Sequence, residues 1–261
     1  MSVGAPAGFR ISVSTWSLHR DLEAGRLTLL DVPRRCAEAG IRTIEVCHFH
    51  FPQSDADYLG RLAAAARDAG VEIYSILVDD GDLTDTDPGC RKKTLDMLGS
   101  WIGVAGTLGA SRVRIVAGQA APTPAAIALA GATLQALADV GRTRGVAVST
   151  ENFGKLTVRA AAVLGVLDAA GPGIGLCADF GNFKGPDKHA DLALVMPRAT
   201  SLHAKCIARA DGTLDWEEFR ACLGIAKAAG FAGPCSLIHE GQDDTWAALA
   251  ALKREVEAVC R

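Results

Sequence analysis

The run Val148-Ser149-Thr150-Glu151-Asn152-Phe153-Gly154 decides the fold, because a β-rich stretch delivers a carboxylate and then breaks on glycine. Three later stretches share this shape, and their polar ends are Asp179, His203 and Glu240. The carboxyl ends of parallel barrel strands meet on one face of the barrel. We therefore expect these four side chains to converge, and we expect that face to carry the chemistry.

The rest of the chain alternates between short apolar runs and Ala-rich helical runs, with a glycine after most helices. Glycine just past a helix takes the left-handed conformation that ends it. The pattern predicts strands at residues 11–15, 43–47, 72–78, 112–116, 146–151, 174–179, 200–205 and 235–240. It predicts helices at residues 57–69, 90–108, 124–143, 158–169, 216–229 and 244–259. Eight such units predict an α/β fold, a single (β/α)8 TIM barrel over residues 1–261. No glycine-rich phosphate loop follows the first strand, which argues against a doubly wound sheet.

Composition narrows the class of function. The formal net charge is -3, whereas a dedicated nucleic-acid binder normally carries a basic excess. The first residues lack the pattern of a signal peptide, and no run reaches the roughly 20 apolar residues of a membrane span. Eight cysteines without a Cys-x-x-Cys pair favour reduced thiols. We expect a cytoplasmic protein that binds neither nucleic acid nor membrane.

The polar strand ends have the composition of a metal site. Strand side chains alternate between faces, so Glu151, Asp179, His203 and Glu240 are all able to point into the barrel mouth. Carboxylates with one imidazole suit a single divalent ion, with Mn²⁺ as the first choice and Mg²⁺, Co²⁺ or Zn²⁺ as alternatives. A carboxylate at a strand end is also a common helix N-cap, which is the competing interpretation of Asp179 alone.

Several motifs resemble the xylose isomerase-like TIM barrels, a family of sugar phosphate isomerases and epimerases. The resemblance extends over nearly the whole chain, and its motifs are Ser14-Thr15-Trp16-Ser17-Leu18-His19-Arg20, Asp79-Asp80-Gly81, Leu108-Gly109-Ala110, Val113-Arg114, Glu151-Asn152, Asp179-Phe180-Gly181-Asn182-Phe183, His203-Ala204-Lys205, Ala229-Gly230-Phe231 and His239-Glu240-Gly241. It implies one divalent metal held by Glu, Asp, His and Glu on the fifth to eighth strands. The first three ligands carry over as Glu151, Asp179 and His203.

The fourth ligand departs from the family pattern. Ile238 stands where the resemblance expects a glutamate, and Glu240 lies two residues, about 6.6 Å, further along the strand. Either Glu240 serves from this shifted position, or three protein ligands leave a side for water or substrate, or the metal is lost. Asn182 similarly stands where a substrate-binding histidine is common.

The resemblance also implies the reaction, which is proton abstraction next to a carbonyl through an enediolate. Glu151 is the first choice for the base, and Glu240 would be the second. Lys205 shares a face with His203, so it is either a stabiliser of oxyanion or carboxylate charge or a lysine of the barrel rim.

Further residues are candidates for substrate contact. Trp16 is either a ring that stacks on a sugar or a core tryptophan. The other candidates are His19, Glu45, Asn182 and His239. His48 and His50 form an alternating pair that is either metal-binding or part of a rim loop. No Walker loop, Ser-His-Asp order or dinucleotide fingerprint appears in the sequence.

The leading hypothesis is a divalent-metal-dependent isomerase or epimerase of a small, unphosphorylated carbohydrate, with a homo-oligomer in keeping with the resemblance. The nearest alternative is a lyase on the same scaffold, a keto-polyol dehydratase or a 3-keto-glycoside eliminase. Two further alternatives are a phosphodiesterase of the apurinic endonuclease type and a non-catalytic sugar-binding barrel.

Overall fold

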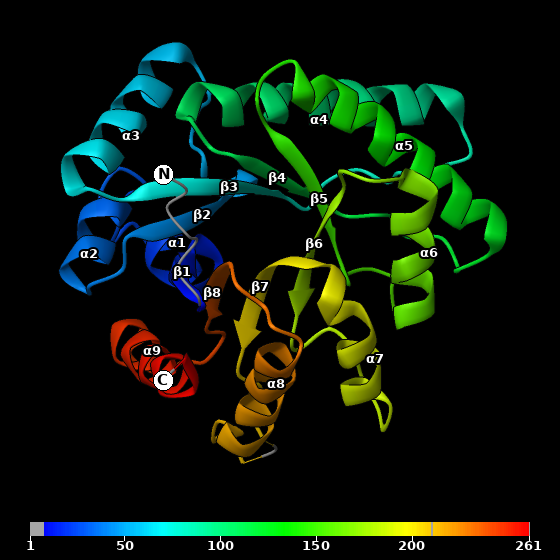
Figure 1. Cartoon of the computed structure of the whole chain (residues 1–261). Helices are drawn as coiled ribbons and strands as arrows, with labels where there is room; N and C mark the ends of the chain where they lie inside the picture. Colours follow the sequence, from blue (N-terminus) through cyan, green and yellow to red (C-terminus); the bar gives the residue numbers. More distant parts are fainter. Residues whose placement is uncertain (1–7, 210, 261) are drawn as a thin grey trace, which may run out of the picture.

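The structure, a computed structural model, describes residues 8–209 and 211–260. Eight parallel strands close into a barrel in the order β1 to β8, and β8 returns to pair with β1 (Figure 1). The strands are β1 Arg10–Ser14, β2 Thr43–Cys47, β3 Glu72–Val78, β4 Arg112–Ile115, β5 Ala147–Glu151, β6 Gly175–Asp179, β7 Ala199–Lys205 and β8 Pro234–Ile238. This confirms the expected (β/α)8 barrel.

Helices cover the outside of the barrel (Figure 1). They are α1 His19–Glu23, α2 Val32–Glu38, α3 Ala56–Ala69, α4 Pro88–Leu108, α5 Pro124–Arg142, α6 Ala160–Ala170, α7 Lys188–Val195, α8 Trp216–Ala228 and α9 Thr245–Cys260, with short 3-10 turns η1 Thr15–Leu18, η2 His48–His50 and η3 Met196–Arg198. No range was predicted for α1, α2 and α7, because helices of 5, 7 and 8 residues show little apolar periodicity.

The helix ends explain why a glycine follows most of the helical runs in the sequence. At the start of α3, the Asp55 side chain accepts a hydrogen bond from the Tyr58 amide, and the helix ends at Gly70, whose φ is 62°. A residue with a Cβ is strained in that left-handed conformation, so glycine is favoured there. Helix α3 can therefore stop sharply and lead straight into β3.

The two faces of the barrel strands differ in character. Alternate side chains such as Val13, Val113 and Leu202 are fully buried in the hydrophobic core between strands and helices. The other face of the strands is polar, and its contacts cross the barrel interior, as when Arg112 donates to Thr200 Oγ1 over 2.9 Å. The barrel is thus held by its outer apolar layer, which leaves the inner layer available for chemistry.

From the sequence we expected no run long and apolar enough to span a membrane, but one described helix, α5, meets that requirement by length and composition alone, with 19 residues and a mean hydropathy of 1.3. In the structure α5 packs against α4, α6 and β5, as expected of a helix that covers a barrel.

Candidate metal centre and active site

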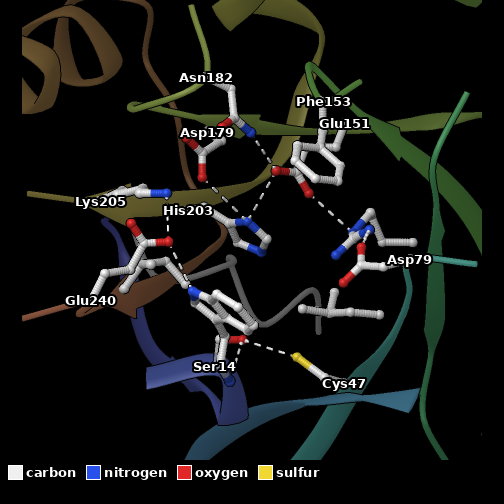
Figure 2. A pocket seen from close by; sticks show the side chains of 14 residues that line it. Ser14, Cys47, Asp79, Glu151, Phe153, Asp179, Asn182, His203, Lys205 and Glu240 are labelled. Atoms are coloured by element: carbon white, nitrogen blue, oxygen red, sulfur yellow. Dashed lines mark hydrogen bonds and ion pairs between the residues drawn. The ribbon is translucent and has the colours of Figure 1, made fainter. Parts of the chain in front are cut away.

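A cavity of about 130 Å³ opens at the carboxyl ends of the strands. The residues predicted from the sequence that line it are Trp16, Glu151, Asp179, Asn182, His203, Lys205 and Glu240. The lining residues that were not predicted as site residues are Ser14, Cys47, Leu77, Asp79, Arg114, Phe153 and Ile238. Figure 2 shows that the labelled side chains point toward one another, among them Glu151, Asp179 and His203 from three strands.

Three predicted ligands come together at the centre of this cavity. The Nδ1 atom of His203 lies 3.4 Å from Glu151 Oε1 and 3.6 Å from Asp179 Oδ2 (Figure 2). All three side chains are buried. The Sγ atom of Cys177 lies within 4.8 Å of ligand atoms of Glu151 and His203. One imidazole nitrogen facing two carboxylate oxygens fits a single hard or borderline divalent ion.

The Asp179 carboxylate is fixed by its neighbours. Its backbone pairs with the Asn152 side chain, whose Oδ1 accepts from the Asp179 amide over 2.7 Å and whose Nδ2 donates to the Asp179 carbonyl over 3.0 Å. Oδ1 of Asp179 accepts from the Gly181 amide over 2.6 Å, which leaves Oδ2 to face His203.

The opposite nitrogen of the His203 ring meets a carboxylate that does not line the cavity. Nε2 lies 2.8 Å from Oε1 of Glu45, which is fully buried on β2. Burial alone would lower the pKa of His203, but Cys177 and the carboxylates of Glu45 and Glu151 raise that pKa well above its usual value. Burial likewise opposes ionisation of Glu45, but the charge of His203 together with hydrogen bonds from His203, Tyr74 and Ser236 lowers the Glu45 pKa.

Arg114 is the main site residue that the sequence analysis missed. Its Nε lies 3.0 Å from Glu151 Oε2, and its guanidinium also pairs with Asp79. Burial would lower the pKa of Arg114, but Asp79 and Glu151 raise it. The available signal was an arginine inside an apolar strand, at the alternate position that faces the barrel interior.

Glu151 is therefore held on both oxygens. Asn182 Nδ2 donates to Oε1 over 2.9 Å, and Arg114 pairs with Oε2. Burial raises the pKa of Glu151, but the charges of His203 and Arg114 outweigh burial and the net shift is downward. Glu151 is consequently ionised at neutral pH, as both a metal ligand and a proton acceptor must be.

Glu240 lies at the cavity rim, beyond the end of β8, and not inside the strand as the sequence predicted. Its Oε1 accepts hydrogen bonds from Lys205 Nζ over 2.7 Å and from Trp16 Nε1 over 2.9 Å. Its side chain is 43% exposed. Within the described part of the chain, no hydrogen bond or ion pair joins Glu240 to the three central ligands, and Ile238 also lines the cavity.

The remaining predicted residues do not line the cavity. His19 stacks on Trp16 with ring centroids 4.9 Å apart, and its Nδ1 lies 3.2 Å from His50 Nε2. His239 is buried, with its Nε2 3.0 Å from Asp243. These histidines support the rim, and none of them lines the cavity.

A model of the family described as xylose isomerase-like TIM barrel matches residues 33–258. Solved structures share the fold. D-psicose 3-epimerase with D-tagatose from Clostridium cellulolyticum is 14% identical, with a TM-score of 0.75 over 97% of this chain and 100% of that chain. A xylose isomerase-like barrel from Mycobacterium smegmatis in complex with magnesium is 20% identical, with a TM-score of 0.72 over 97% of each chain. The probable 3-DHS dehydratase from Bacillus anthracis is 16% identical, with a TM-score of 0.73 over 97% of this chain and 99% of that chain.

A comparison with curated protein sequences gave no match. The family match extends from α2 to α9 and includes every residue of the three-ligand cluster. The chain therefore belongs to the xylose isomerase-like TIM barrel family.

Proposed function

We propose that this protein is a divalent-metal-dependent isomerase or epimerase of a sugar or keto-sugar, acting by proton abstraction next to a carbonyl. The observation that carries the proposal is the meeting of Glu151, Asp179 and His203 in one cavity. The epimerase and the magnesium complex among the similar structures support it by analogy.

Glu151, Asp179 and His203 would hold the ion, which would polarise a substrate carbonyl and stabilise the negative charge of the enediolate. Among the three, Glu151 is our choice for the base. Its depressed pKa keeps it free of a proton at neutral pH, although the same shift makes it a weaker base. The reaction therefore needs both the Glu151 carboxylate as base and an ion that makes the substrate C–H bond more acidic.

The residues around Glu151 would control its position. Arg114 on one oxygen and Asn182 on the other restrict the carboxylate to one orientation. The Phe153 side chain lies beside Glu151 and gives this part of the cavity an apolar wall (Figure 2). Such a wall reduces access of water to the base and strengthens electrostatic interactions within the site.

Solvent exchange tests this proposal directly. The wild type, supplied with Mn²⁺, is incubated in D₂O with a panel of ketoses and keto-sugars, and NMR follows loss of a substrate C–H signal. We expect exchange with at least one substrate, and a loss of about 10²–10⁴-fold in Glu151→Gln. Glu72→Gln, which changes an exposed carboxylate on β3, is the matched control. A metal-loaded protein that exchanges no proton across the panel would refute the proposal.

The opposite side of the cavity favours a second candidate, a lyase. Lys205 and Glu240 lie on one side of His203, and Glu151 lies on the other (Figure 2). In an elimination, Glu151 would accept the proton from carbon, the adjacent C–O bond would break, and Lys205 would protonate the departing oxygen. Release of water or an alcohol in the same NMR experiment, with an unsaturated or keto product, would identify this outcome.

A further inference from the structure

The Glu45 carboxylate is buried in the barrel interior, where it contacts His203. Glu45 is 1% exposed, and its Oε1 lies 2.8 Å from His203 Nε2. The two residues stand on β2 and β7, which are not neighbours in the barrel, so their contact spans its interior. Burying a carboxylate costs several kcal/mol unless its partners offset the lost hydration. The arrangement of those partners indicates what Glu45 does.

The second oxygen of Glu45 is already occupied. Tyr74 donates its hydroxyl to Oε2 over 2.6 Å, and the same hydroxyl lies 3.1 Å from Ser236 Oγ. Tyr74 and Ser236 are buried on β3 and β8, on either side of Glu45 in the barrel interior. The carboxylate is thus fixed in orientation, and Oε1 is the oxygen directed at His203.

This contact decides which nitrogen of His203 serves the cavity. An ionised carboxylate has no proton to donate, and its charge 2.8 Å from Nε2 favours a proton on that nitrogen. Nδ1 is then the nitrogen left for a metal, and it faces Glu151 Oε1 at 3.4 Å and Asp179 Oδ2 at 3.6 Å. A histidine whose far nitrogen is held by a carboxylate has a fixed tautomer, a fixed ring and a more basic ligand nitrogen.

We propose that Glu45 is a positioning residue for the metal site, holding the His203 ring so that Nδ1 points at Glu151 and Asp179. This inference rests on the metal site proposed above. It gives Glu45 a role other than the substrate contact expected from the sequence, and it makes Tyr74 part of the same support.

Metal binding tests the role of Glu45. Protein is first freed of metal, and Mn²⁺ affinity is then measured by calorimetry at constant pH. We expect Glu45→Gln to bind Mn²⁺ about 10–100-fold more weakly than the wild type. Tyr74→Phe keeps the carboxylate and removes one of its hydrogen bonds, so a smaller loss is expected. Glu72→Gln makes the same chemical change on an exposed side chain and should bind as the wild type does. Equal Mn²⁺ affinity of Glu45→Gln and wild type would overturn the inference.

A second measurement needs no metal. In ¹⁵N NMR of the metal-free wild type, the Nε2–H signal of His203 should be visible far downfield because a carboxylate accepts its proton. The signal should move upfield or vanish in Glu45→Gln. A wild type without this bonded proton would overturn the inference. A wild type that shows it but binds no Mn²⁺ would refute the proposed metal-dependent function and still support the hold of Glu45 on the ring.

Discussion

Replacing Arg114 by methionine provides a strong test of the electrostatics of this site. The guanidinium pairs with Glu151, whose side chain is 4% exposed, and with Asp79, whose side chain is 29% exposed. Methionine fills similar space without charge, so both carboxylates lose their cation. Asp79 recovers part of this loss from water. Glu151 cannot, so most of the cost should arise there.

The expected loss is about 3–5 kcal/mol of unfolding free energy in the metal-free protein, the usual cost of leaving a buried charge without its partner. For a chain of this size it corresponds to a fall of roughly 6–20 °C in Tm. An ion bound by Glu151 would supply part of the missing positive charge. Saturating Mn²⁺ should therefore raise the Tm of Arg114→Met by more than it raises that of the wild type.

The matched control is Arg112→Met, on the same strand and the same face. Arg112 donates to a neutral partner, Thr200 Oγ1, over 2.9 Å, so its loss should cost about 1–3 kcal/mol. Scanning calorimetry with and without Mn²⁺ measures both variants. The reasoning is refuted if Arg112→Met is as destabilised as Arg114→Met, or if Mn²⁺ stabilises Arg114→Met no more than wild type.

Three further predictions concern the ion itself. Metal analysis should find about one ion per wild-type chain, little in Glu151→Gln, and near wild-type content in Glu240→Gln, because Glu240 already accepts two hydrogen bonds from other groups; loss of the ion in Glu240→Gln would instead identify a fourth ligand. The raised pKa of His203 means that metal binding must displace its proton, so calorimetry should find Mn²⁺ affinity falling by up to tenfold per pH unit on acidification below that pKa, and a flat profile would contradict the ligand role. For the metal-free protein the sign is opposite, since the same raised pKa stabilises the fold at low pH and this contribution is lost as pH rises through the folded value. Ile238→Glu, which adds a carboxylate to the cavity wall, should tighten Mn²⁺ binding by at least about tenfold if the site has an open side; weaker binding would contradict a three-ligand site.

The sequence was sufficient to predict the barrel because its information is local. Each strand is a short apolar run, and a glycine such as Gly70 ends the helix before it, so most predicted strand ends fall within one residue of the observed ones. The exception is informative. The predicted eighth strand extended to Glu240, whereas the backbone pairing of β8 ends at Ile238. The alternation of side chains along a strand therefore cannot be extended to Glu240.

Contacts across the barrel could not be predicted from such local sequence patterns. Glu45 and His203 are far apart in the chain, and they meet because the curvature of the closed sheet brings β2 and β7 face to face. The resemblance to the family suggested a pocket role for Glu45, but not its contact with His203. Arg114 was within reach of sequence reasoning, since a charge at an inward position of a buried strand requires a partner, but the sequence does not say that the partner is Glu151.

The charge balance of the barrel interior gives a reason for a divalent ion beyond the geometry of its ligands. Four carboxylates, from Glu45, Asp79, Glu151 and Asp179, surround two cationic side chains, Arg114 and His203. Lys205 does not alter this balance, because it is paired with Glu240. An excess of negative charge in a poorly hydrated interior must be relieved either by protons or by a cation. A proton on the Asp179 oxygen that faces His203 would remove that oxygen as a ligand atom. A proton on Glu151 would oppose the lowered pKa of that residue. A divalent cation relieves the same excess without protonating the carboxylates, and exchange of the His203 proton for the ion would reduce the excess from two negative charges to one.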